Sequence, residues 1–244
     1  MNLYLIRHAE SYGNIKGKII STTDFELTEK GIAQAQRLGK KICSELNKTP
    51  LSAYCSPLAR AGQTLTEILR SIGQENTEIT ETDLLKEMDL GSLEGMTWEE
   101  RKQKYPEIDL DKKLSLLLAP GGESYNDVKN RCKMFAETCL EKEDNEKNVI
   151  IVSHGITLRI LTNTLLNRPD EDVNFLNWTE NTSLTELFRD KESHTYQLVR
   201  LNDYSHLNEL KTAGYEKWGL FAERDYWAMK NKPYKCNTHI NTIL

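Results

Sequence analysis

The 244-residue sequence lacks several features that would place it in particular protein classes. No apolar run approaches the roughly 20 residues that a membrane-spanning helix needs, and Val149–Val152 is among the longest. The N-terminus shows no basic segment followed by a long apolar one, so we expect no signal peptide. Asp and Glu (37) outnumber Lys and Arg (32), giving a net charge of −5. This balance argues against general binding to nucleic acid or to an anionic membrane.

Cysteine is scarce, and the spacing of the cysteines matches no paired motif. The five cysteines form no C-x-x-C pair and their number is odd, so we expect reduced thiols and a cytoplasmic protein. Cys132 and Cys139 lie seven positions apart in a predicted helix, and we interpret them as core residues.

Common catalytic motifs are also missing. The sequence has no G-x-S-x-G elbow, no phosphate-binding loop of the form G-x-x-x-x-G-K-[ST] and no G-x-G-x-x-G. Cys55 precedes Arg60 by five positions rather than the six that a cysteine-based phosphatase uses. Histidine and carboxylate residues near His8 are too sparse for a metal site. We therefore expect neither a metal nor a cofactor.

What the sequence does contain is an alternation of apolar strand and helix patterns. Strands are predicted at Leu3–Ile6, Leu51–Ser56 and Val149–Val152, all apolar enough for buried positions. Thr28 is the predicted N-cap of a helix whose apolar face contains Ile32, Ala35, Leu38, Ile42 and Leu46. Further helices are predicted around Leu65–Ile72, ending at Gly73, over Glu123–Glu143, and after His154. Leu184–Phe188 and Tyr196–Leu201 are predicted to pair as a hairpin.

These elements predict an α/β fold, a three-layer sandwich whose mostly parallel central sheet is flanked by helices and has an antiparallel edge. We expect one domain over residues 1–244, with an insertion at 98–120 near the active site. The insertion's leucines can be core or substrate-lining, and its lysines solvated or ligand-binding. The aromatic-rich tail, residues 208–244, can be a packed helix, a lid or an oligomer contact, so a homodimer is one option.

Basic and imidazole side chains follow three of the predicted strands. Arg7 and His8 end the first, Arg60 lies just beyond the second, and His154 directly follows the third. Because the carboxyl ends of parallel strands meet at one edge of a sheet, these side chains should converge there. Guanidinium groups beside a helix N-terminus favour a phosphate or carboxylate ligand. With the other nucleophile motifs missing, a neutral imidazole remains as the nucleophile towards phosphorus, kept unprotonated by the flanking arginines.

Five ordered sequence blocks resemble the histidine phosphatase superfamily, the phosphoglycerate mutase-like group, over roughly residues 1–207. The first runs from Leu5 to Ser11 and continues through Asn14 to Gly31. The others are Ser56–Thr64, Glu87–Gly95, Gly121–Ser124 and Val152–Gly155, followed by Asn181–Ser183 and Arg200–Leu207.

The resemblance implies a metal-independent phosphomonoester hydrolase that acts on a small phosphorylated substrate. His8 would become a phosphohistidine, and Glu87 would protonate the leaving group. The phosphoryl oxygens would be held by Arg7, Arg60 and His154, with Asn14 as a further donor. The alternatives are a phosphoglycerate-type mutase and a non-catalytic phosphate-binding scaffold.

The sequence departs from the family pattern at several positions. Ala9 replaces a usual Gly, and Ile20-Ser21 replaces the Gln-Gly of many members, which would remove a polar substrate contact. Mutases of the family resemble one another in a Glu-Arg-His-Tyr-Gly segment, whereas Met88 and Asp89 follow Glu87 here. An acidic side chain at that position would repel a second anionic group, so we predict net hydrolysis.

Overall fold

A computed structural model describes residues 1–46, 49–110, 113–176, 179–207 and 210. Apart from Leu210, the predicted tail 208–244 lies outside these described residues. The strands are β1 (Asn2–Arg7), β2 (Leu51–Cys55), β3 (Ile79–Glu81), β4 (Asn148–Ser153), β5 (Leu184–Arg189) and β6 (Tyr196–Asp203). The α-helices are α1 (Glu29–Ile42), α2 (Ala59–Ser71), α3 (Trp98–Lys104), α4 (Tyr125–Thr138) and α5 (Gly155–Leu165).

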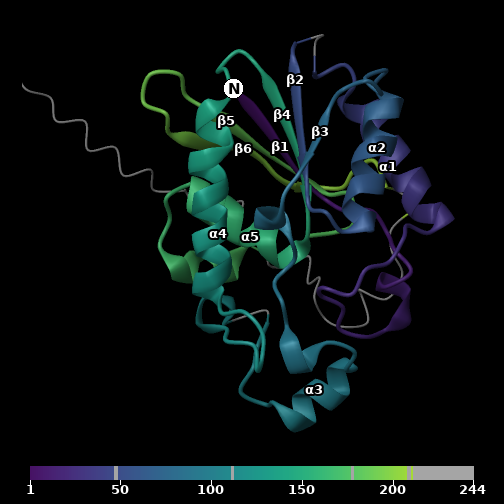
Figure 1. Ribbon diagram of the computed structural model, residues 1–244, viewed down its shortest axis with the longest axis vertical. Helices are drawn as coiled ribbons and strands as arrows, with labels where there is room; N and C mark the ends of the chain where they lie inside the picture. The colour runs from purple at the N-terminus through teal and green to yellow at the C-terminus, as the bar shows by residue number, and fades with distance from the viewer. Residues whose placement is uncertain (47–48, 111–112, 177–178, 208–209, 211–244) are drawn as a thin grey trace, which may run out of the picture.

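Within the described residues, the strands form a six-stranded sheet in the order β3-β2-β4-β1-β5-β6. Strands β3, β2, β4 and β1 are parallel, whereas β5 pairs antiparallel with both β1 and β6. Helices α1 and α2 lie on one side of the sheet, and α4 and α5 on the other (Figure 1). The predicted three-layer α/β sandwich with an antiparallel edge is confirmed.

The two faces of β1 contact the two helical layers in alternation. Leu3 and Leu5 belong to the apolar cluster formed with α4 and α5, whereas Tyr4 and Ile6 belong to the cluster formed with α1 and α2. Such two-sided burial is the reason that the strand is apolar throughout. It also fixes the end of β1, and therefore His8, firmly within the sheet.

Local signals placed most helix ends correctly. Thr28 caps α1 by accepting a hydrogen bond from the Gly31 amide, and Gly73, just beyond α2, has a φ of 71°. Three expectations were wrong. Helix α1 ends at Ile42, so Leu46 is buried beyond the helix rather than on its face. Ile32 is 38% exposed rather than part of the apolar face. The helix predicted to reach Glu143 ends at Thr138 and gives way to a short 3-10 helix, since the polar residues there add no further buried turn.

The insertion, residues 98–120, is only partly core. Leu114 and Leu117 are buried, whereas Leu116 and Leu118 are exposed. Arg101 is buried, and its guanidinium donates to the Ile108 carbonyl oxygen at 2.5 Å. In the described part of the chain, no helix is long and apolar enough to cross a membrane.

Candidate active site

His8 lies directly after β1 with its backbone held on both sides. Its amide donates to the Ser153 carbonyl oxygen at 2.9 Å, and its carbonyl oxygen accepts from Asn181 Nδ2 at 2.8 Å. The ring atom Nδ1 lies 2.8 Å from the Ala9 carbonyl oxygen. Because a carbonyl oxygen only accepts, Nδ1 must carry the hydrogen, and Nε2 is left with its lone pair. The local geometry thus selects Nε2 as the nucleophilic atom.

The His8 imidazole is neutral at physiological pH. Burial lowers its pKa well below the usual value, the Arg60 and Arg7 charges lower it further, and the hydrogen bond to Ala9 opposes them. The sequence interpretation attributed this effect to the arginines alone. Burial turns out to be the larger cause, because His8 is only 4% exposed.

His154 lies directly after β4, at the N-terminus of α5, and is completely buried. Its ring centroid is 5.1 Å from that of His8. Nε2 lies 2.8 Å from Ser56 Oγ, and the same hydroxyl oxygen accepts a hydrogen bond from the Leu58 amide at 3.3 Å. With the Leu58 amide donating to it, the Ser56 hydroxyl is free to donate its own hydrogen to Nε2, and in that tautomer Nδ1 is the protonated nitrogen.

Nδ1 of His154 has no hydrogen-bond partner among the described residues and is buried. Burial lowers the pKa of His154 well below its usual value, followed by the charge of Arg60. A buried N–H donor without a partner is costly unless a ligand satisfies it. The arrangement therefore fits an oxyanion bound beside the two imidazoles.

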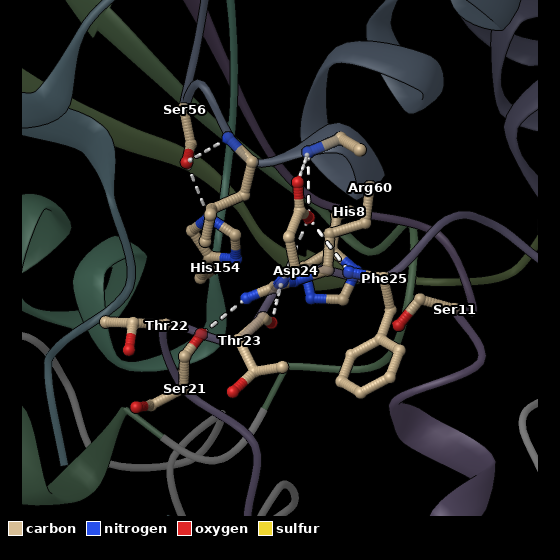
Figure 2. Close-up of polar contacts among 12 residues, drawn as sticks. His8, Ser11, Ser21, Thr22, Thr23, Asp24, Phe25, Ser56, Arg60 and His154 are labelled. Atoms are coloured by element: carbon tan, nitrogen blue, oxygen red, sulfur yellow. Dashed lines mark hydrogen bonds and ion pairs between the residues drawn. The ribbon is translucent and has the colours of Figure 1, made fainter. Parts of the chain in front are cut away.

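Arg60 lies in the first turn of α2 and is 2% exposed. Its Nη1 donates to the Thr23 carbonyl oxygen at 3.0 Å, and Nη2 donates to the Ser21 carbonyl oxygen at 2.7 Å. Asp24 Oδ1 lies 3.7 Å from Nη1. Figure 2 shows His8, His154 and Arg60 facing one another beside this segment.

Arg7, the last residue of β1, is also buried, and its Nη1 donates to the Thr179 carbonyl oxygen. The charges of Arg7 and Arg60 both act on the two imidazoles. The four residues that end or follow three predicted strands are therefore together, as expected from the topology. Asn14 lies nearby in a 3-10 helix (Asn14–Lys16), and its Oδ1 accepts from the Ser11 amide at 2.9 Å.

Glu87 is not part of α5 but lies against its N-terminal end, and it is 8% exposed. Its Oε1 accepts hydrogen bonds from the amides of Met88 and Thr157 at 2.9 and 3.1 Å. The Thr157 hydroxyl lies 3.2 Å from Oε1 but donates its one hydrogen to the Lys86 carbonyl oxygen, at 2.6 Å. Oε2 accepts only one, from the Ile156 amide at 3.2 Å. The Glu87 charge also raises the pKa of Arg60, against the larger lowering by burial. The carboxylate is thus oriented, with Oε2 the less occupied oxygen.

Sequence reasoning did not single out Ser56 or Asn181 as site residues. Ser56 orients His154, and Asn181 Nδ2 reaches both the His8 carbonyl oxygen and, at 3.5 Å, Asn14 Oδ1. Both occur within matched sequence blocks, so a block-by-block search for buried polar residues was the available signal. Among the described residues, no group of three or more His, Cys, Asp or Glu could hold a metal ion.

Comparison with known proteins gives one consistent family. Residues 3–204 match the model of the histidine phosphatase superfamily (branch 1). A phosphoserine phosphatase 1 of Hydrogenobacter thermophilus is 35% identical over 172 residues, covering 68% of this chain and 76% of the relative. A 2,3-bisphosphoglycerate-dependent phosphoglycerate mutase of Xanthobacter autotrophicus is 31% identical over 166 residues, covering 67% and 80%.

Among solved structures, a mycobacterial glucosyl-3-phosphoglycerate phosphatase in complex with VO3 superposes with a TM-score of 0.71 and 26% identity. The superposition covers 82% of this chain and 98% of that protein. The matches therefore include both phosphatases and a mutase.

Proposed function

The chain belongs to the histidine phosphatase superfamily, and from that premise we propose that it is a metal-independent phosphomonoester hydrolase acting through a phosphohistidine on His8. The observation that carries the proposal is the state of His8. Its Nδ1 is committed to the Ala9 carbonyl oxygen, and its imidazole is buried and neutral beside two guanidinium groups. A neutral imidazole with a free lone pair is a nucleophile, and the cations supply a place for the phosphoryl group.

In the first step, Nε2 of His8 attacks phosphorus while the bond from phosphorus to the ester oxygen breaks. The leaving oxygen takes a proton from Glu87, and we assign that proton to Oε2 because it has a single hydrogen-bond donor. Arg7, Arg60 and the unpartnered Nδ1–H of His154 hold the phosphoryl oxygens. Asn14 would add a further donor.

In the second step, water attacks phosphorus and the bond to Nε2 breaks, releasing inorganic phosphate and neutral His8. The water gives its proton to Glu87, which restores the carboxylic acid for the next cycle. Since positioning and charge stabilisation dominate phosphoryl transfer, these residues can perform it without a metal.

The substrate class that fits is a small phosphomonoester with an aliphatic leaving group, because such a group needs the proton that Glu87 supplies. Relatives named as phosphoserine and glucosyl-3-phosphoglycerate phosphatases support this class. A cytoplasmic location belongs to the same proposal, and the cysteines in the described residues, which are all free thiols, are compatible with it.

A mutase is the second candidate, because a phosphoglycerate mutase is among the relatives. The segment after Glu87 favours hydrolysis instead. Met88 is completely buried in the apolar core, and Asp89 Oδ1 accepts from the Gly91 amide at 2.8 Å. Neither side chain can replace a basic pair, and Asp89 would repel a second anionic group by about 1–4 kcal/mol at close range.

Three measurements test the proposal. His8→Ala should lower kcat by several orders of magnitude, because removal of the nucleophile is among the costliest changes in covalent catalysis. Activity of the wild type should survive EDTA, and rapid acid-free quenching should trap phosphate on His8. Full activity of His8→Ala, or dependence on an added divalent metal, would refute the mechanism.

Measuring phosphate release beside interconversion of 2- and 3-phosphoglycerate distinguishes a hydrolase from a mutase. We expect phosphate release to dominate. Interconversion that is faster and needs a bisphosphorylated primer would establish the mutase instead.

A further inference from the structure

The segment Ser21–Thr23, where the sequence departs from its family, connects two charged residues. Ser21 is completely buried, although Thr22 and Thr23, which follow it, are exposed. Its hydroxyl donates to Glu94 Oε2 at 2.9 Å and accepts from the Leu90 amide at 3.2 Å. The serine therefore does not face substrate; it ties the segment to the loop that follows Glu87.

Glu94 binds this segment through five hydrogen bonds. Its carboxylate accepts from the amides of residues 21, 22 and 23 at 2.8–3.4 Å and from the hydroxyls of Ser21 and Thr22 at 2.9 and 3.0 Å. Three successive N–H groups around one anion form a nest. Burial alone would raise the pKa of Glu94, but hydrogen bonds from Thr23 and Ser21 outweigh it and lower the pKa to about 2. The carboxylate is charged throughout the physiological range.

Two carbonyl oxygens of the same segment face Arg60. The carbonyl oxygens of Ser21 and Thr23 accept from Nη2 and Nη1 of Arg60 at 2.7 and 3.0 Å (Figure 2). The peptide that joins Ser21 and Thr22 has Glu94 on its N–H side, at 3.4 Å, and Arg60 on its C=O side, at 2.7 Å, so the anion and the cation polarise this peptide in the same direction. The Thr23 carbonyl oxygen belongs to the following peptide, and Glu94 acts on it by holding the segment that precedes it.

We propose that Glu94 is a positioning residue that holds Arg60 at the phosphoryl site through the backbone of residues 21–23. The inference rests on the proposed function, in which Arg60 binds phosphoryl oxygens. The contact of Arg60 with Asp24 is longer, at 3.7 Å, and Asp24 is 45% exposed. The two carbonyl oxygens are therefore the main restraints on the guanidinium, and Glu94 is what orients them.

Loss of the Glu94 charge should let residues 21–23 rotate and displace the guanidinium. A displacement of about 1 Å at a catalytic group can cost 10²-fold in rate. We expect Glu94→Gln to lower kcat/KM for an aryl phosphate by about 10–100-fold and to weaken binding of inorganic phosphate and vanadate by a similar factor. The weaker Ser21→Ala change, which removes only the hydroxyl contacts, should cost a few-fold.

Glu143→Gln is the matched control. Glu143 is another partly buried carboxylate, and it accepts hydrogen bonds from Ser52 Oγ at 2.9 Å, from Tyr54 and from Lys147. Ser52 and Lys147 lie at the amino-terminal ends of β2 and β4, whereas His8 follows the carboxyl end of β1. The control should lose stability without losing kcat/KM or phosphate affinity.

The decisive experiment introduces Glu94→Gln and Ser21→Ala, each separately, into an Arg60→Ala background. If Glu94 acts through Arg60, Glu94→Gln and Ser21→Ala should change phosphate affinity and kcat/KM less than about twofold there. Equal losses with and without Arg60, or unchanged phosphate and vanadate affinity in both variants, would overturn the proposal. If Glu94→Gln does not fold, the results for Ser21→Ala alone test the proposal.

Phosphate and vanadate affinities, measured calorimetrically, need no turnover. A wild-type protein that binds these anions without hydrolysing any phosphomonoester would refute the proposed function. The anion affinities of wild type and variants would still test whether Glu94 positions Arg60. A wild type that binds neither anion would overturn the positioning proposal as well.

Discussion

Replacing Glu87 by glutamine tests the proton donor, and the structure defines what this change does. The glutamine carbonyl oxygen can take the Oε1 position and keep its two amide donors, Met88 and Thr157. The NH₂ group must then occupy the Oε2 position, where it faces the Ile156 amide, itself a donor. One buried donor loses its acceptor, so the variant should be less stable by about 1–3 kcal/mol.

The kinetic effect should depend on the leaving group. An aliphatic alkoxide is strongly basic and leaves only with a proton, so Glu87→Gln should lower kcat/KM for an aliphatic phosphate by about 10²–10⁴-fold. A nitrophenolate is a weak base and leaves almost unaided. For 4-nitrophenyl phosphate the loss should therefore be under about tenfold.

The assay compares both substrates with wild type and variant at one pH, with stability measured by urea unfolding. Thr157→Val provides a control, because it removes the hydroxyl beside Oε1, with its hydrogen bond to the Lys86 carbonyl oxygen, while the Ile156 amide still donates to Oε2. Its effect should be small and similar for both substrates. Equal losses for the aryl and the aliphatic phosphate in Glu87→Gln would show that Glu87 does not donate the proton.

Three further predictions concern packing, tautomer and pH. Ser56→Ala should lower kcat/KM and phosphate affinity about tenfold, because His154 Nε2 loses the hydroxyl that fixes its tautomer. Ser56→Thr keeps a hydroxyl and should retain most of both quantities. Gly31→Ala should lower the free energy of unfolding in urea by at least about 2 kcal/mol, because the added Cβ would lie 2.0 Å from a backbone oxygen. Gly62→Ala, in α2, should raise it by about 0.5–1 kcal/mol, because the nearest atom to the added Cβ is 3.7 Å away. Burial lowers the pKa of His206 to about 4, so the unfolded chain binds this proton first and stability should fall as pH drops from about 6.5 towards 4. His206→Gln should reduce that fall in pH-dependent unfolding by about 1–3 kcal/mol, and an unchanged pH dependence would contradict the assignment.

The sequence by itself determined the sheet and the residues at its carboxyl edge. Continuous apolar runs mark β1 and β4 because both faces of these strands are buried, and the residues that follow them, His8 and His154, must then meet. The cap at Thr28 was also readable, because its hydrogen bond to Gly31 lies within four residues. Strand β3 was not predicted, because three residues are too few to show a period.

Tertiary structure alone decided how the site side chains are held. The partners of His154 and Arg60 lie far away in sequence, at Ser56 and at residues 21–23. Glu94, 71–73 positions from the amides it binds, has no local pattern that distinguishes it from a solvated carboxylate. Periodicity reports which face of an element is buried, whereas the acceptor that a buried donor finds depends on how separate elements pack. The same reason explains Ile32: its spacing matched the apolar face, but the packing of the described residues leaves it 38% exposed.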